Sequence, residues 1–513
     1  MMKKTQKLWF PPLLSYQTYI ETLKELNSDE VFEGLLGYGL FAEVLPPIFT
    51  SELFLDFCLM NKPIFTQEKA DYIKYESIRN NNSVRLFGIP TPFTYYNLCT
   101  KIRDKWTDIL KHFEKMTVGQ KHKISRLHVR KLYQSKSLFQ MNYQNWWKDE
   151  TPSTDLSIGA RFLVRADIST CFPSIYTHAI AWALMTKQTA KQTMKVKATR
   201  HWEHHLDKLV RSTTNLQTQG ILIGPHASNI ISEIILTAVD KELYKRGFSY
   251  IRFIDDYECY VSSYEEAEEF LRALRGELRE YELLINDKKT KIIPLPISKE
   301  YHWTNRLNQE EPIPINGVIN YKQIKRFLDL AISLVESNDD DLSILKYALK
   351  MVSEFKLSHN ARVLAQKHYL HLAIIYPYLV RVLEKYVFES LKTDPNVISD
   401  WSNEFFPIFL KQGNYEAAAY LIYFAIKYNF EIKDLSEENI IDTTDCIVKA
   451  LGSIYFLNRG SKKYIDIYND ALRLSQDTIQ SEQQWLYWYT TLEEKDLTGD
   501  WKDIKRAGIS FVN

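Results

Sequence analysis

The sequence of 513 residues has few cysteines, no long apolar run and almost no net charge. Its five cysteines are far apart and form no CxxC pair. This argues against a disulfide framework and a cysteine-based zinc site, and it is typical of a reducing compartment. The longest apolar runs, such as AAAYLIYFAI from Ala417, are too short to cross a bilayer, and two prolines interrupt the opening MMKKTQKLWFPPLL. We therefore expect a cytoplasmic protein with no membrane partner.

A histidine-based metal site has little support either. The segment RHWEHHLDKL places His201 and His205 one helical turn apart, a spacing that can bind a metal ion. It lacks the H-E-x-x-H order and any cysteine partner, so surface or core histidines explain it better.

The net charge of +1 does not indicate a nucleic-acid partner. Local charge is different, because Lys and Arg outnumber Asp and Glu between Lys101 and Lys148 and again between Lys187 and Arg211. Such stretches can hold phosphates by Coulomb attraction and counterion release. A solvated helix face explains the second stretch equally well.

A chain of this length is expected to form more than one domain. The pattern of predicted helices and strands divides it into three regions. Residues 1–160 mix helices with basic, aromatic loops, residues 161–318 alternate strands and helices, and residues 319–513 form successive amphipathic helices. An antiparallel hairpin within the second region excludes a simple doubly wound sheet. The sequence predicts an α+β fold, with an antiparallel sheet and helices followed by an all-α region of stacked helix pairs.

The segment IRFIDDYECYV, residues 251–261, places Asp255 and Asp256 side by side at the tip of a predicted hairpin. Adjacent carboxylates repel, so one would be protonated unless a cation were present. An exposed turn can contain two aspartates for local capping alone. However, Asp167 closes a second predicted strand, FLVRADI. If these strands are neighbours, the carboxylates can hold two Mg²⁺ ions, or Mn²⁺, for an in-line phosphoryl transfer.

Four sequence blocks in order resemble the palm of a reverse transcriptase, and with it a right-hand polymerase fold of fingers and palm. They are ADISTCFPSIYTHAI from Ala166, QGILIGPHASN from Gln219, FIDDY from Phe253 and NDKKT from Asn286. Four blocks in this order are far more specific than any one of them. GIPTPFTYYNL from Gly88 resembles an upstream finger block more weakly.

The resemblance implies a role for individual residues. Asp167, Asp255 and Asp256 would be catalytic, and the metal ligands would be Asp167, Ile168 and Asp255. Phe172 occupies the steric-gate position, where a ring crowds a ribose 2′-hydroxyl and favours deoxynucleotides; a core phenylalanine is the alternative. The implied nucleotide-binding residues are Phe172, Gln219, Gly220, Pro225, Lys289, Arg126 and Arg130. Arg85 and Lys123 are further candidates for the triphosphate, ranked slightly below the two arginines.

The blocks and the helical third region resemble the abortive-infection type of bacterial reverse transcriptase, in which fingers and palm precede a helical-repeat (HEAT-like) domain. This implies a homo-oligomer that polymerises deoxynucleoside triphosphates without a template in antiphage defence. A tyrosine of the protein would prime the single-stranded DNA product, which would stay covalently attached. Tyr16, Tyr19 and Tyr38 are N-terminal candidates.

The sequence departs from the family pattern at two places. Phe253 stands where tyrosine is usual, which is a conservative change, and residues 295–320 match a primer-grip hairpin poorly, which favours an unusual substrate. A templated RNA-directed DNA polymerase in defence is a second hypothesis. A helical-repeat interaction protein with an inactive palm is a third, although the intact aspartate set argues against it.

Overall fold

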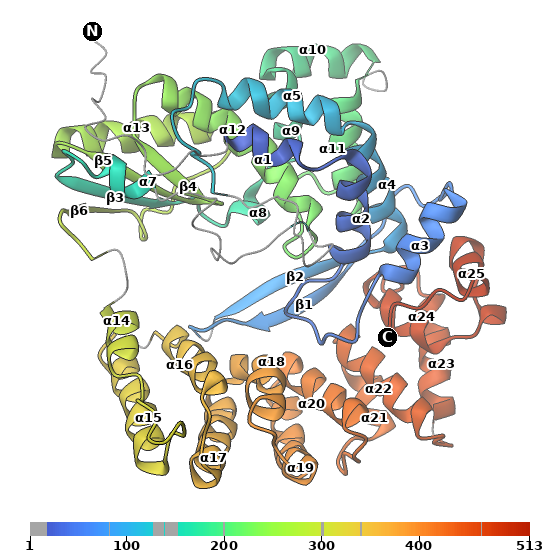
Figure 1. The fold of residues 1–513 in the computed structure, drawn as a ribbon. Helices are drawn as coiled ribbons and strands as arrows, with labels where there is room; N and C mark the ends of the chain where they lie inside the picture. Colours follow the sequence, from blue (N-terminus) through green and yellow to red (C-terminus); the bar gives the residue numbers. More distant parts are fainter. Residues whose placement is uncertain are drawn as a thin grey trace.

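The structure, a computed structural model, combines two small antiparallel sheets with many helices (Figure 1). It describes residues 18–81, 83–126, 138, 152–197, 201–298, 302–338, 341–462 and 464–513. Mixed helix and antiparallel sheet is the class that the sequence predicted.

The larger sheet has four strands in the order β4-β5-β3-β6, and all of its pairs are antiparallel. Its strands are β3 (Phe162–Asp167), β4 (Tyr250–Phe253), β5 (Asp256–Val261) and β6 (Lys291–Pro294). The second sheet is the hairpin of β1 (Tyr72–Ile78) and β2 (Val84–Pro90). Strand β3 lies between β5 and β6, and its antiparallel pairing places the end of β3 beside the start of β5.

Helices from the first two regions pack around these sheets. They are α1 (Tyr19–Lys24), α2 (Ser28–Tyr38), α3 (Glu52–Asn61), α4 (Pro92–Asp104), α5 (Trp106–Thr117), α7 (Pro152–Leu156), α8 (Cys171–Ser174), α9 (Ala179–Met185), α10 (Lys187–Lys197), α11 (Trp202–Ser212), α12 (Ala227–Lys245) and α13 (Tyr264–Glu280). Helix α12 is buried along most of its length and packs against α5, α9 and α13.

Helix α13 shows how local sequence produces this packing. Ser263 caps its start, because the serine side chain accepts a hydrogen bond from the backbone N–H of Glu266. Its buried residues recur at helical spacing and form one face that packs on β3 and β5. That face consists of Ala267, Phe270, Leu271, Ala273, Leu274 and Leu278.

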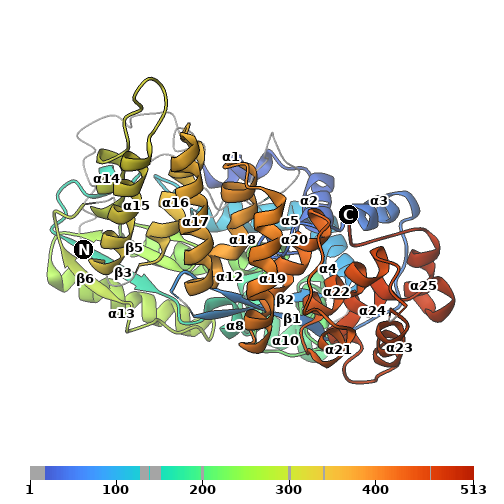
Figure 2. The same ribbon diagram turned by 90° about the horizontal axis from the view of Figure 1, so that it is seen from below.

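The described residues after 301 contain no strand of either sheet. Their elements are α14 (His302–Gln309), α15 (Tyr321–Glu336), α16 (Ser343–Glu354), α17 (His359–Ile375), η2 (Pro377–Leu379), α18 (Val380–Leu383), η3 (Glu384–Glu389), α19 (Pro395–Lys411), α20 (Tyr415–Lys427), α21 (Glu437–Asp442), α22 (Cys446–Asn458), α23 (Tyr464–Ser475), η4 (Glu482–Gln484), α24 (Trp485–Thr491), η5 (Glu494–Asp496) and α25 (Gly499–Arg506). Figures 1 and 2 show them as a row of neighbouring helices along the β1–β2 side of the molecule. The HEAT-like repeat and the boundaries at 160 and 318 stay predictions.

The third region packs closely on the first. Strand β1 contacts α20 and α22. Residues 509–513 return to the first region, where Thr50 N–H donates to the carbonyl of Phe511 (3.0 Å) and Asn513 N–H to that of Ile48 (2.9 Å). One apolar cluster extends through all three regions. No described helix has the length and hydropathy needed to span a membrane.

Candidate active site

The antiparallel pairing of β3 with β5 brings the three predicted aspartates together. Asp167 ends β3 and lies opposite Asp256, the first residue of β5. Ile168 N–H donates to the carbonyl of Asp255 at 3.1 Å, which fixes the turn against the end of β3. One oxygen from each carboxylate lies within 4.8 Å of the others. The juxtaposition on which the sequence hypothesis depended is therefore present.

Ile254, in the turn that presents Asp255, adopts a left-handed backbone conformation, with φ of +58°. This conformation is unfavourable for a β-branched residue, so the surrounding structure must hold it. Arg252 supplies one such contact, because its Nη1 donates to the carbonyl of Ile254 at 2.7 Å.

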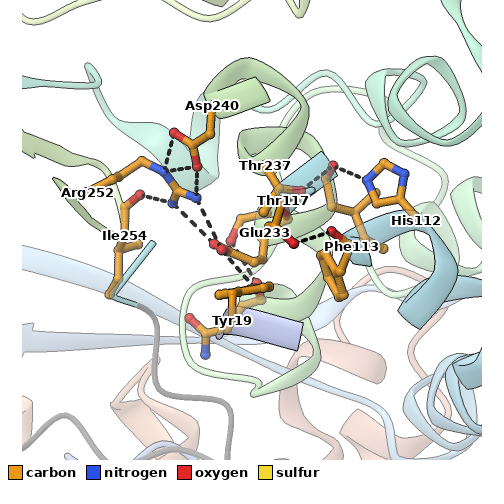
Figure 3. Close-up of polar contacts among 12 residues, drawn as sticks. Tyr19, His112, Phe113, Thr117, Glu233, Thr237, Asp240, Arg252 and Ile254 are labelled. Atoms are coloured by element: carbon orange, nitrogen blue, oxygen red, sulfur yellow. Dashed lines mark hydrogen bonds and ion pairs between the residues drawn. The ribbon is translucent and has the colours of Figure 1, made fainter. Parts of the chain in front are cut away.

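Arg252 is itself fully buried in a network of charged side chains (Figure 3). Its guanidinium donates to Asp240 at 2.6–3.1 Å and to Glu233 at 3.1 and 3.2 Å. The hydroxyls of Tyr19 and Tyr250 donate to Glu233 (2.9 Å) and Asp240 (3.2 Å). Buried charges persist only when they are paired and hydrogen-bonded. The network therefore ties the aspartate turn to α12.

The sequence analysis missed this network. Its signal was present as one arginine in the apolar strand YIRF and two carboxylates in the apolar helix ASNIISEIILTAVDKEL. Charged residues in segments that are otherwise buried need partners, and each could have been matched to the other.

The site carries more negative charge than its surroundings neutralise. Burial raises the pKa of Asp255, and the charge of Asp167 raises it further. Burial and the two neighbouring carboxylates raise the pKa of Asp256 to about 6. A divalent cation relieves this repulsion, and clustered carboxylate oxygens are the hard ligands that Mg²⁺ or Mn²⁺ takes. The donor set therefore fits such an ion. Ile168, the third predicted ligand, offers only its carbonyl oxygen, because its side chain is apolar.

The fourth sequence block, NDKKT, folds as a turn against Asp167. Asn286 donates twice to this aspartate, from its backbone N–H to the carbonyl (2.7 Å) and from Nδ2 to Oδ2 (2.9 Å). Lys289 Nζ lies 3.1 Å from the same Oδ2. Thr290 donates from its backbone N–H (3.0 Å) and hydroxyl (2.8 Å) to the carbonyl of Asn286. Asn and Lys therefore orient and neutralise Asp167, and Thr290 closes the turn.

The second block packs on the segment that contains Phe172. Phe172 is half-buried in α8, and its carbonyl accepts from Ile221 N–H at 2.9 Å. Gly220 N–H donates to the carbonyl of Ile175 (2.8 Å), and Gln219 Nε2 to that of Ser174 (2.8 Å). Phe172, Gln219 and Gly220 thus belong to segments that contact one another, and their nucleotide-binding role stays a prediction.

Gly220 is required by this packing for two reasons. Its φ of +90° lies in the region that side chains disfavour. A Cβ atom there would also come within 3.0 Å of the carbonyl oxygen of Pro173.

Two other predicted nucleotide-binding residues, Pro225 and Arg126, are buried. Pro225 is buried beside apolar residues that include Tyr95 and Ile231. The side chain of Arg126 is 5% exposed, and its backbone N–H donates to the carbonyl of Arg252 at 2.7 Å. Arg130 lies outside the described residues.

Arg85, on β2, has a charge that acts on the site. It lowers the pKa of Asp255, against the larger effects of burial and Asp167. The sequence ranked it below Arg126 and Arg130. Its place three residues before the block GIPTPF was the available signal.

Two of the three candidate primer tyrosines can be placed. Tyr19 is 5% exposed, and burial together with Glu233 raises its pKa well above the ordinary value. Tyr38 donates its hydroxyl to Glu52 at 2.9 Å, and burial and this contact raise its pKa to about 12. Tyr16 lies outside the described residues. The hydroxyl of Tyr19 is therefore buried and engaged by Glu233 in this conformation.

Comparison with known proteins identifies the domain. The family model of reverse transcriptase (RNA-dependent DNA polymerase) matches residues 99–319, which contain all four blocks. These residues are therefore similar to a reverse transcriptase domain. No curated protein sequence matches the chain.

The solved structures that the chain matches include telomerases from Candida species. Apo telomerase from Candida tropicalis is 10% identical, with 86% of this chain and 73% of that chain covered and a TM-score of 0.34. A form truncated from its C-terminal domain is 11% identical, with coverages of 48% and 56% and a TM-score of 0.31. Telomerase from Candida albicans in complex with a fragment of telomeric RNA is 11% identical, with coverages of 78% and 64% and a TM-score of 0.30. The chain thus spans 56% of the truncated form, and the domain assignment rests on the family model rather than on these scores.

Proposed function

We propose that the chain polymerises deoxynucleotides by two-metal nucleotidyl transfer at Asp167, Asp255 and Asp256. The observation that carries this proposal is the convergence of the three carboxylates within 4.8 Å, inside a reverse transcriptase domain. Bound Mg²⁺ would neutralise charge on the transferring phosphoryl group and align the reacting oxygens. Asp167 and Asp255 would hold the ions with the carbonyl of Ile168, and Asp256 would support them.

The chain's own residues would bind and select the nucleotide. Lys289, now paired with Asp167, is proposed to turn to the triphosphate once a cation neutralises that carboxylate. Arg85 would approach the triphosphate from the β1–β2 hairpin. Phe172 would exclude a ribose 2′-hydroxyl, with Gln219 and Gly220 beside it in the pocket.

We further propose that synthesis is untemplated and primed by a tyrosine of the protein, in antiphage defence of the abortive-infection type. The order of the four blocks, the helical region after residue 319 and the poor primer-grip match at 295–320 support this proposal. The helical region would be a HEAT-like repeat, and the enzyme a cytoplasmic homo-oligomer. Because Glu233 engages Tyr19, we expect the priming tyrosine to be another one.

Labelling distinguishes the proposal from its alternatives. The purified protein is incubated with Mg²⁺ and each labelled deoxynucleoside triphosphate, without nucleic acid. Label that stays on the denatured protein and is released by protease supports self-priming. Label that requires an added RNA template and primer would indicate templated synthesis instead. If neither condition gives incorporation, the polymerase proposal fails and an interaction protein with an inactive palm is favoured.

A further inference from the structure

A cavity of about 190 Å³ lies among α9, α10 and α11, outside the carboxylate site. Its volume is about six times the ~30 Å³ that one water molecule occupies in the liquid, so it can admit a planar ring. Helix α9 packs against both α10 and α11, and Figure 1 shows the three helices on one side of the molecule. The lining residues are Tyr176, His178, Ala181, Trp182, Ala190, Lys191, Met194 and His204.

The walls combine aromatic rings with basic groups. The ring centroid of Tyr176 lies 4.9 Å from that of His178 and 5.5 Å from that of Trp182. Lys191 adds a cation, and none of the described lining residues is acidic. Aromatic faces with a nearby cation form the kind of surface on which nucleic-acid bases stack while phosphates are attracted.

Buried polar partners fix the two histidines. His178 Nδ1 lies 2.6 Å from Oδ2 of Asp207, whose side chain is 1% exposed, and Arg211 Nε donates to the other oxygen at 3.1 Å. Although burial opposes it, the contact with His178 holds the pKa of Asp207 below its usual range. His204 Nε2 lies 2.9 Å from the hydroxyl of Thr193. Fixed side chains that line a cavity are prepared to bind a ligand without further ordering.

The cavity is connected to the proposed nucleotide pocket through the backbone. Tyr176 pairs with Gln219 in an isolated antiparallel bridge, and Thr177 N–H donates to the carbonyl of Thr218 at 2.9 Å. The segment that contains Phe172 thus continues directly into the cavity wall. A strand bound near Phe172 would pass close to this cavity.

We propose that this cavity is a second nucleic-acid site, which binds one unpaired nucleobase by stacking on Tyr176 and by a hydrogen bond to Nε2 of His178. Lys191 attracts the adjoining phosphate. The base comes either from a single strand or from a free nucleotide. The inference rests on the proposed function only for the identity of that strand, which would be the polymerase's substrate or product.

Binding without chemistry tests the proposal separately from catalysis. Fluorescence anisotropy measures the affinity for fluorescein-labelled oligo(dT) in EDTA, where no transfer can occur. We expect Tyr176→Leu to weaken binding about tenfold, since loss of one stacked base costs roughly 1.4 kcal/mol. Lys191→Gln, at an exposed position, should also weaken binding without affecting folding. Tyr321→Leu and Lys322→Gln, at exposed positions on α15, are matched controls and should bind as the wild type does.

Competition with dTMP identifies the source of the base. If the two cavity variants weaken oligo(dT) alone, the site takes a strand; if they weaken dTMP equally, it takes a free nucleotide. Either result supports the nucleobase site. Equal affinities of wild type, cavity variants and controls for both ligands would overturn it. Absence of nucleotide incorporation by the wild type would instead count against the polymerase proposal and leave this binding result standing.

Discussion

At the scale of single residues, the site depends on carboxylates that oppose one another. Burial and mutual charge raise the pKa values of both Asp255 and Asp256. A surface aspartate is neither buried nor crowded by other carboxylates. Loss of its charge should therefore affect activity less than loss of the charge of Asp255 or Asp256. Substitution by asparagine removes the charge and keeps the shape, which makes it the suitable change.

Asp255→Asn should abolish nucleotide incorporation, with a fall of about 10³-fold or more, because loss of a metal ligand removes several kcal/mol of transition-state stabilisation. Incorporation of labelled deoxynucleotide is the measurement. The control is Asp287→Asn, because this side chain is 74% exposed and pairs with Arg275 at the surface. Equal activity of the two variants would contradict the assigned role.

Phe172→Ala should admit ribonucleotides, because the ring that is proposed to crowd the 2′-hydroxyl is removed. The ratio of kcat/KM for deoxynucleotides to that for ribonucleotides should fall about tenfold or more, the effect of ~1.4 kcal/mol of lost discrimination. Phe172→Tyr keeps the ring and should keep the ratio. If alanine leaves sugar selectivity unchanged, Phe172 is a packing residue only.

At the scale of elements, the β4–β5 hairpin presents the aspartates because Arg252 on β4 pairs with Glu233 and Asp240 on α12. The hairpin and its double aspartate could be predicted, since strand patterning and turn position are local properties of the sequence. The Arg252 network was missed, although charged residues in otherwise buried segments indicated that each needs a partner. Which charges pair depends on how α12 packs against β4, and no periodicity in either element encodes that pairing.

Arg252→Met should lower the free energy of unfolding by about 3–5 kcal/mol, because it leaves Glu233 and Asp240 buried without their cation. Chemical denaturation measures the change. Combining it with Glu233→Gln and Asp240→Asn should restore most of the loss, since the uncompensated charges are then gone.

Arg275→Met is the control for that experiment, because the Arg275–Asp287 pair is exposed and should contribute less than about 1 kcal/mol. If Arg252→Met is no more destabilising than Arg275→Met, the network does not support the turn.

At the scale of the whole molecule, the helical third region contacts the β1–β2 hairpin through one buried glutamate. Glu416 on α20 accepts from Ile78 N–H at 2.7 Å and from the hydroxyl of Ser77 at 3.0 Å, and it pairs with Arg381 at 3.3 Å. Ser77 lies opposite Arg85 in the hairpin. The contact therefore connects the third region to the strand pair that carries Arg85, whose charge lowers the pKa of Asp255.

Glu416→Ala should loosen the hairpin and lower the free energy of unfolding by roughly 3 kcal/mol, because it leaves Arg381 without its buried partner. Hydrogen exchange of residues 72–90 should rise, and the KM for nucleotide should increase as Arg85 loses its fixed position. Glu389→Ala removes a carboxylate that is 56% exposed, so it should leave the free energy of unfolding, the hydrogen exchange of residues 72–90 and the KM unchanged. Unchanged exchange in the hairpin of Glu416→Ala would show that the two regions are not coupled here.

The helical periodicity of the third region is strong enough to predict from sequence that it consists of successive amphipathic helices. Its attachment to the first region could not be predicted. The pairing of residues 509–513 with residues 48–50 joins segments far apart in the chain, and the Glu416 contact joins a helix to a strand edge. Neither has a local pattern, because their partners are set by tertiary packing alone.

The central claim is that Asp167, Asp255 and Asp256 together hold divalent cations for nucleotidyl transfer. Anomalous diffraction from crystals grown with Mn²⁺ and a non-hydrolysable deoxynucleoside triphosphate tests it most directly. The account predicts anomalous peaks between Asp167 and Asp255, adjoining the nucleotide phosphates, and their loss in Asp255→Asn. Nucleotide bound with no such peak, or peaks only at other residues, would contradict it.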